Sequence, residues 1–234
     1  MKHREVLKNI SRLVFVKIPL AFVGVTFLWV LLLKWIPVYY TPLMAIRSVE
    51  YRNDEKFHTY KRWQPLEKIS SNMVMAVMAG EDNRFADHHG FDWVELKKAI
   101  KEKKSGKRVR GASTISQQTA KNVFLWPGKS LFRKALEAYF TLLIELVWGK
   151  ERIMEVYLNV AEMGKGIYGA EAAAERIFQT RASKLTVHQS SLIAASLPNP
   201  ITRRAEKPTK YHRKRAADIR RLMNNLERPE WLMR

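Results

Sequence analysis

Two adjacent acids, Glu81 and Asp82, open the segment EDNRFADHHG, which is rich in residue types that can do chemistry. The acids fall at the predicted end of a helix, where the helix dipole repels anions. Partial burial beside Met78 would raise the pKa of such a carboxyl group, as a general base working near neutral pH requires. The segment therefore predicts a catalytic carboxylate. The alternative is a solvated helix end with Arg84 as salt partner.

A second polar segment, GASTISQQTAKN at 111–122, places hydroxyl and amide groups at a predicted helix start after a glycine. Free N–H groups at a helix start can bind phosphate or sugar oxygens. Gln118 and Lys121 lie three residues apart and can share a face, so they could offer an amide and a cation to one ligand. Ordinary capping by Ser113 or Thr114 is the alternative, and taken alone it is the simpler explanation.

Two more patterns follow along the chain. Arg133 and Glu137 are four residues apart and face the same way on a predicted helix. A surface ion pair worth ~0.3–0.5 kcal/mol explains this spacing, whereas a pyrophosphate site would use Arg133 to hold the anion. In the segment EVYLN, Asn159 precedes several glycines, and holding a neighbouring loop is favoured over catalysis.

The elements that must position these residues are mainly helical, because apolar residues recur with helical spacing through most of the chain after residue 65. The stretch from Arg47 to Gln64 is polar and predicts loop or short strand. Thr186 with Gln189 reads as a capping box. The first predicted helix starts at Ser70 or Ser71 and carries Glu81, a second covers 93–103 and a third begins near Thr114. Two long helices cover 133–148 and 150–163, and an Ala-rich helix ends at Phe178. The last two run from Thr186 to Pro198 and over 203–221.

Composition limits the kinds of function. The chain has 234 residues, with 42 Lys+Arg against 22 Asp+Glu and a formal charge of +20, which favours anionic partners. It contains no cysteine, which excludes disulfides, thiolate metal sites and thiol nucleophiles. The length suits one anchor and one globular domain, with little left for a second catalytic module.

The amino-terminal part predicts a membrane anchor. Residues 13–33 are apolar apart from Lys17 and long enough to cross the hydrocarbon layer. Five Lys/Arg residues lie within residues 2–17 against one acid, so the positive-inside rule places the amino terminus in the cytoplasm. A cleaved signal peptide fits less well, because no small-residue cleavage site follows. The expected organisation is a cytoplasmic tail at 1–12, a transmembrane helix at 13–33, a juxtamembrane linker at 34–64 and an outer domain at 65–234.

With these four groups in this order, the chain resembles the peptidoglycan glycosyltransferase family. It shares the patterns EDxxFxxHxG, GxSTxxQQxxKN, RKxxE and YLNxxxxGxxxxG over roughly Ile69 to Pro200. The wording YLNVAEMGKGIYGAEAAAERIF is closest to the monofunctional biosynthetic branch, and the lack of a penicillin-binding module after residue 200 agrees with that. The resemblance implies a mainly α, lysozyme-like domain with two lobes around a cleft, preceded by one transmembrane helix.

The resemblance also implies an activity: polymerising lipid II into β-1,4-linked strands, with inversion and release of undecaprenyl pyrophosphate. Glu81 would be the general base for the acceptor hydroxyl, and Glu137 would assist at the donor. Lys121 and Arg133 would stabilise the leaving pyrophosphate. The remaining residues implied to bind substrate are Asp82, Phe85, His88, Ser113, Thr114, Gln118 and Asn122. Ser116 and Thr119 depart from the family pattern, and we expect them to affect packing only.

The resemblance allows Mg²⁺ or Mn²⁺ to assist pyrophosphate departure, although nothing in the sequence marks a dedicated metal site, since His88 and His89 lack a second matched pair. It implies as partners lipid II, the growing lipid-linked strand, the membrane and proteins of cell-wall synthesis or division, with no nucleic acid. The expected location is the inner membrane, with the catalytic domain in the periplasm. The rival hypotheses are a lytic transglycosylase or lysozyme-like hydrolase, and a non-enzymatic anchored protein that binds anionic polymer or lipid.

Two surface features predict contact with lipid. Eight Lys/Arg and one Glu lie between Lys97 and Arg110, and 203–221 is also strongly basic, which suits anionic phosphates at a membrane. The apolar segment from 124 to 132 is interrupted by a Pro-Gly pair and is predicted to dip into the bilayer and admit the lipid tail of the substrate. Its apolar members are Phe124, Leu125, Trp126, Leu131 and Phe132.

Overall fold

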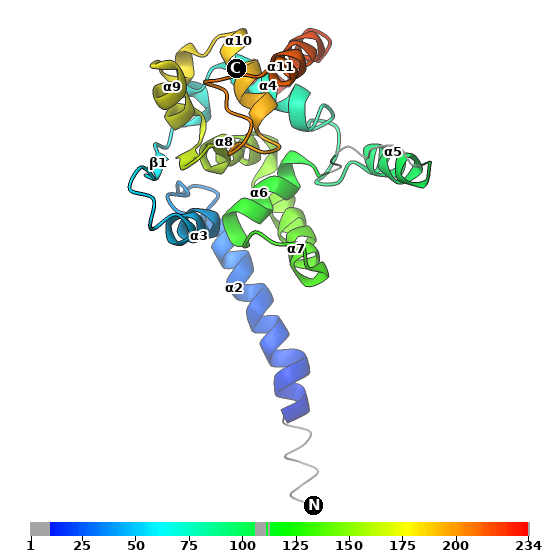
Figure 1. Cartoon of the computed structure of the whole chain (residues 1–234). Helices are drawn as coiled ribbons and strands as arrows, with labels where there is room; N and C mark the ends of the chain where they lie inside the picture. The colour runs from blue at the N-terminus through cyan, green and yellow to red at the C-terminus, as the bar shows by residue number, and fades with distance from the viewer. Residues whose placement is uncertain (1–9, 106–110, 112, 234) are drawn as a thin grey trace, which may run out of the picture. The chain divides into compact units, whose positions relative to one another are not determined.

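The computed structural model describes residues 10–105, 111 and 113–233, in two compact units, Met1–Ile36 and Pro37–Arg234. The first unit is a helix, with π-helical turns over Leu13–Lys17 (η1) followed by α2 (Ile18–Leu32) (Figure 1). Its 23 residues from Ile10 to Leu32 are long and apolar enough to cross a membrane. Thr26 donates its hydroxyl to the carbonyl of Phe22 at 2.7 Å, so this polar side chain is satisfied within the helix.

The second unit is mainly helical, which confirms the predicted fold class (Figure 1). One group of packed helices consists of α4, α10 and α11, and another consists of α6, α7 and α8. The helices of the unit are α3 (Pro42–Glu50), α4 (Ser71–Glu81), α5 (Trp93–Lys104), α6 (Ile115–Phe124), α7 (Leu131–Val147), α8 (Gly149–Val160), α9 (Ala170–Phe178), α10 (Val187–Ser196) and α11 (Lys210–Met223). Single 3₁₀ turns are η2 (Leu66–Lys68), η3 (Ala182–Lys184) and η4 (Glu230–Leu232).

A small sheet accompanies the helices, in the order β1-β3-β2. Strand β1 (Tyr60–Lys61) pairs parallel with β3 (Ile167–Tyr168), which pairs antiparallel with β2 (Glu162–Gly164). Gly169 follows β3 with φ +83°, and a Cβ there would lie 2.8 Å from the carbonyl oxygen of Asn159. Only glycine tolerates both the conformation and the close approach, so this glycine lets α9 begin directly against the end of α8.

Helix starts follow local capping chemistry. Thr114 and Thr186 each form a capping box, with Gln117 and Gln189 respectively. The box at Thr186 confirms the sequence prediction. The other cap residues that accept a backbone N–H through a side-chain oxygen are Thr41, Ser70, Asp92, Ser130 and Thr209.

Helix α3 lies in the segment predicted as a juxtamembrane linker. Thr41 caps it through Met44 N, and Pro42 supplies a first-turn residue whose missing N–H costs nothing there. Met44 is fully buried, and α3 contacts α6. Part of the predicted linker, helix α3, therefore packs against the other helices of the second unit.

The two residues that depart from the family pattern serve packing, as predicted. Ser116 donates to Glu145 Oε1 at 2.5 Å, and the same oxygen accepts from Lys150 at 2.6 Å. Thr119 donates to the carbonyl of Ile115 at 2.8 Å and is fully buried. The two bonds to Glu145 join α6 and the start of α8 to α7, so the helices that carry most of the predicted site form one packed group.

Candidate active site

Glu81 is the last residue of α4 and is held by a hydrogen bond from a distant helix. Its Oε2 accepts from Gln118 Nε2 of α6 at 2.9 Å. Burial raises the pKa of Glu81, while the Gln118 bond and the positive charges of Arg215, Lys121 and Arg203 oppose the rise. A carboxyl with a raised pKa that still ionises is suited to accept a proton near neutral pH.

Tyr157 of α8 fixes the orientation of Gln118. Its hydroxyl donates to Gln118 Oε1 at 3.2 Å, which turns the amide nitrogen toward Glu81. Burial and the charges of Glu81 and Asp82 hold the pKa of Tyr157 well above its ordinary value, so the hydroxyl stays a neutral donor. Sequence reasoning missed Tyr157, although it stands in the YLN pattern beside Asn159.

Asn159 holds a neighbouring loop through its side chain, as the sequence predicted. Its side-chain oxygen accepts from Gln64 N at 2.8 Å, and its nitrogen donates to the carbonyls of Gln64 and Glu155, both at 2.8 Å. The side chain is buried, so these bonds satisfy it completely. The segment before η2 is thereby fastened to α8.

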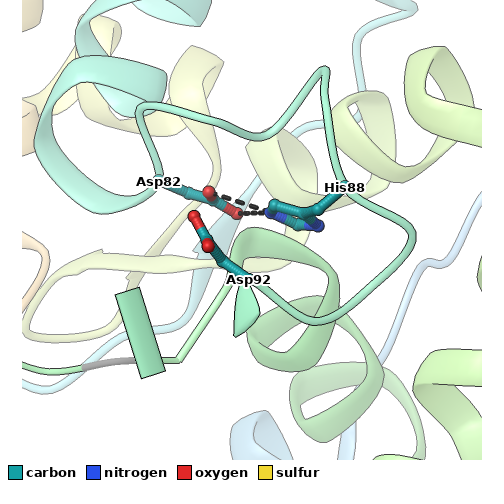
Figure 2. A group of neighbouring side chains, drawn as sticks. All are labelled: Asp82, His88 and Asp92. Carbon is teal, nitrogen blue, oxygen red and sulfur yellow. Dashed lines mark hydrogen bonds and ion pairs between the residues drawn. The ribbon is translucent and has the colours of Figure 1, made fainter. Parts of the chain in front are cut away.

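Asp82 and His88 form a buried pair next to Glu81 in the sequence, and Asp92 lies close to this pair (Figure 2). His88 Nε2 lies 3.0 Å from both Asp82 oxygens, and Ile115 N donates to Asp82 Oδ2 at 3.0 Å. Asp92 Oδ1 accepts from Val94 N and Glu95 N at the start of α5. The pair thus ties the loop after α4 to the first turn of α6.

Phe85 and Thr114 are also buried rather than open to a ligand. Phe85 is fully buried, with the Lys150 ammonium 4.5 Å from its ring centroid. Thr114 donates to the carbonyl of Gly90 at 2.6 Å and accepts from Gln117 N at 3.2 Å. Asp82, Phe85, His88 and Thr114 are thus buried and, apart from Phe85, engaged in internal hydrogen bonds, and their predicted part in binding substrate stays a prediction.

A cleft of about 370 Å³ brings together most of the other predicted residues. That volume is in the range of ligand pockets. The predicted residues that line it are Ser113, Gln118, Lys121, Asn122, Arg133 and Glu137. Further lining residues, which the sequence analysis did not assign to the site, are Leu43, Arg47, Gln117, Gly128, Lys134, Tyr157, Ala161, Glu162, Leu197, Pro198 and Pro200.

The ion pair between Arg133 and Glu137 is buried, so the surface pair considered from the spacing is wrong. Arg133 Nη1 lies 2.6 Å from Glu137 Oε2, with side-chain exposures of 9% and 4%, and Lys134 pairs with Glu137 Oε1. Burial lowers the pKa of nearby Lys121, and Glu137 counteracts this. Three cations around one carboxylate leave a net positive wall, which is suited to a phosphate anion.

The wall on the side of α3 carries another ion pair. Arg47 lies 2.6 Å from Glu50 and 3.4 Å from buried Glu162. Both Arg47 and Glu162 line the cleft, together with Leu43. Sequence reasoning missed this side because it assigned the segment to a linker, and the TP pair at 41–42 was the available helix signal.

The metal that the family resemblance allows would meet, in the described part of the cleft, only carboxylates that are already paired with cations. These carboxylates are Glu137 and Glu162. Ligand atoms of Asp82, His88 and Asp92 lie within 4.8 Å of one another, but their hydrogen bonds hold the loop after α4 and the starts of α5 and α6. Asp92 Oδ2 and His88 Nδ1 have no hydrogen-bond partner among the described residues, but both Asp82 oxygens are bonded to His88, so this group does not offer three uncommitted ligands to a metal ion.

The apolar segment 124–132 divides into a buried and an exposed part. Phe124 is buried and its ring stacks on Phe140 with centroids 4.4 Å apart, so its predicted contact with lipid is wrong. Leu125 is buried and lines the cleft. Trp126, Leu131 and Phe132 are exposed. The basic stretch after Lys97 lies partly outside the described residues.

Comparison with known proteins agrees with this arrangement. A family model described as Transglycosylase matches residues 49–224. A protein of Bacteroides thetaiotaomicron named biosynthetic peptidoglycan transglycosylase is 58% identical over 204 residues, covering 87% of this chain and 82% of its own length. Proteins of the same name are 54% identical in Caulobacter vibrioides (81% of each chain) and 47% identical in Stutzerimonas stutzeri (99% of this chain, 94% of that one). The chain belongs to the transglycosylase family.

Proposed function

We propose that the cleft joins lipid-linked disaccharides, with Glu81 as the general base. The chain is a peptidoglycan glycosyltransferase that polymerises lipid II, in keeping with its family and the names of its relatives. The single observation that carries the proposal is the partly buried Glu81, bonded to Gln118, which itself lines a cleft with a cationic wall. A base whose hydrogen-bond donor lines a cleft, together with an anion cradle in that cleft, is what glycosyl transfer from a pyrophosphate donor needs.

In the proposed step, the 4-hydroxyl of the acceptor sugar attacks the anomeric carbon of the donor. Its proton passes to a Glu81 oxygen, and the bond from the anomeric carbon to the pyrophosphate oxygen breaks with its electron pair on the leaving group. Attack opposite the leaving group inverts the centre and gives a β-1,4 link. Glu81 needs its raised pKa to take the proton as the hydroxyl becomes acidic.

The leaving undecaprenyl pyrophosphate would bind the cationic wall. Lys121 and Arg133 line the cleft and would take the developing negative charge. Glu137 lines the cleft as well, is bonded to Arg133 and would assist at the donor. Ser113 and Asn122 line the same cleft and would donate hydrogen bonds to sugar or phosphate oxygens. Asp82, Phe85, His88 and Thr114 would act by positioning the base and the start of α6.

The helix over Ile10–Leu32 is a candidate single-pass anchor. We propose the orientation that the basic residues before it favour, with the amino terminus in the cytoplasm and the catalytic unit in the periplasm beside an inner membrane. The functional boundaries would be a tail at 1–12, a span at 13–33, a linker at 34–64 and a catalytic domain at 65–234. The growing strand, the membrane and proteins of wall synthesis or division would be its partners.

The test is polymerisation of fluorescent lipid II by the full chain in detergent, with products resolved by size. Glu81→Gln keeps a group that can face Gln118 but cannot accept the proton, so strand formation should fall roughly 10²- to 10⁴-fold. Glu227→Gln removes an exposed acid elsewhere and serves as the matched control. Strands from the wild type and the control that lysozyme digests would support the proposal.

Other outcomes point to the rival functions. Shortening of preformed glycan without strand formation would indicate a hydrolase, although a cleaving enzyme needs no cationic wall for pyrophosphate. Binding of anionic lipid that survives Glu81→Gln, collapses with salt and comes without turnover would indicate a binding protein.

A further inference from the structure

Arg215 contacts the turn of α4 that presents Glu81, yet it does not line the cleft. Its Nη2 donates to the carbonyl oxygen of Gly80 at 2.8 Å, although the two residues are 135 positions apart. Helices α4 and α11 pack closely here, since a Cβ on Gly80 would lie 3.3 Å from Ile219 Cδ1. A guanidinium is thereby fastened to the peptide that immediately precedes the proposed base.

The position of this charge opposes two unfavourable effects on an ionised Glu81. The carboxyl end of α4 carries a partial negative charge, and burial removes water from the carboxylate. A cation bonded to a carbonyl of the last turn offsets both effects.

Several other groups face Glu81, and substrate would change the influence of some of them. Gln118 and Lys121 face it from α6, Tyr157 from α8 and Arg203 from the segment before α11, while Asp82 is its neighbour in the chain. Lys121 lines the cleft, so a bound pyrophosphate would compensate its charge. Arg215 is committed to a backbone carbonyl outside the cleft lining and keeps its field toward Glu81 when the cleft is filled.

We propose that Arg215 is a positioning residue that fixes the last turn of α4 and keeps Glu81 ionised while the cleft holds pyrophosphate. The inference rests on the proposed role of Glu81 as base. Arg215 acts through Glu81 and touches no reacting atom. Its contribution is therefore greatest at low pH, where Glu81 would otherwise take up a proton before the acceptor arrives.

The experiment compares lipid II polymerisation by full-length wild type, Arg215→Gln, Arg215→Lys and Arg221→Gln from about pH 5.5 to about pH 9. Arg215→Gln keeps an N–H donor for Gly80 and removes the charge. The acid limb of its kcat, which reports the enzyme with substrate bound, should move to higher pH, with a loss of roughly tenfold near pH 6 and less than about twofold near pH 9. Arg215→Lys should restore most of the low-pH activity. Arg221→Gln removes a largely exposed cation of the same helix and should follow the wild type.

An equal loss for Arg215→Gln at every pH would assign Arg215 a purely structural role and overturn the proposal. A pH profile that overlays the wild type would overturn it as well. If Arg215→Gln fails to fold by circular dichroism, Arg215→Met decides: an acid limb moved to higher pH supports the proposal, and a limb at the wild-type position overturns it. A wild type that makes no strands would refute the proposed function itself, which is a distinct outcome.

Discussion

Removing the hydroxyl of Tyr157 should slow the enzyme although this group need not touch the reacting atoms. Gln118 is held from both sides, by the Tyr157 hydroxyl at 3.2 Å and by Glu81 Oε2 at 2.9 Å. In Tyr157→Phe the amide can rotate and turn its oxygen toward the carboxylate. A neutral hydrogen bond is worth ~0.5–1.5 kcal/mol, so kcat/KM should fall roughly two- to tenfold.

Gln118→Met removes the direct bond to Glu81 and should cost more. A hydrogen bond to a charged group is worth ~1.5–3 kcal/mol, which corresponds to roughly 10- to 150-fold in kcat/KM. The Gln118 bond lowers the pKa of Glu81, so its loss raises that pKa. The deficit should be greatest below neutral pH and should shrink as rising pH ionises Glu81 in every variant.

The assay is the initial rate of lipid II polymerisation for the wild type, both single variants and the double variant across pH. Because Tyr157 acts through Gln118, adding Tyr157→Phe to Gln118→Met should cost less than about twofold. Full additivity of the two losses would refute the reasoning. A loss in Gln118→Met that is independent of pH would show that Gln118 acts by touching substrate and leaves Glu81 unchanged.

Three other changes test the walls of the site and its surface. Glu137→Gln leaves buried Arg133 without its carboxylate and should destabilise the fold by ~3–5 kcal/mol in urea unfolding, and an unchanged midpoint would mean that the pair contributes nothing. Replacing exposed Trp126 and Phe132 with serine should weaken liposome binding of a chain starting at Pro37, and undiminished binding would remove the membrane-contact proposal. Gly169→Ala places a Cβ 2.8 Å from a carbonyl of α8 at φ +83°, so calorimetry should record a fall in melting temperature of several degrees, and an unchanged transition would contradict the strain.

Helix starts were predictable because their chemistry is local. Thr186 and Gln189 lie three residues apart, and the box they form depends on little else. The contact of Gln118 with Glu81 was not predictable, since it joins residues 37 positions apart through the packing of α4 near α6. From the sequence, Gln118 was expected to bind the substrate together with Lys121. The fold instead directs its amide nitrogen toward Glu81.

The spacing of residues along the sequence could not predict which of their side chains are buried. The four-residue interval between Arg133 and Glu137 correctly predicts a pair, but an exposed and a buried pair have the same interval. Phe124 was expected at lipid and is buried in the protein core, because its apolar character suits both environments equally. Helix α3 was missed because it has nine residues and leads into a charged stretch that reads as loop.

The cations of the site fall into two sets with different duties. Lys121 and Arg133 face the cleft, where an arriving pyrophosphate would compensate their charge at the moment when Glu81 must still be ionised. An enzyme that relied on these cations alone to keep its base ionised would lose that support on binding its donor. Arg215 is bonded to the carbonyl of Gly80 and escapes this competition. Arg203 also acts on the charge of Glu81 without lining the cleft, and together with Arg215 it would let a single site be both an anion cradle and a proton acceptor.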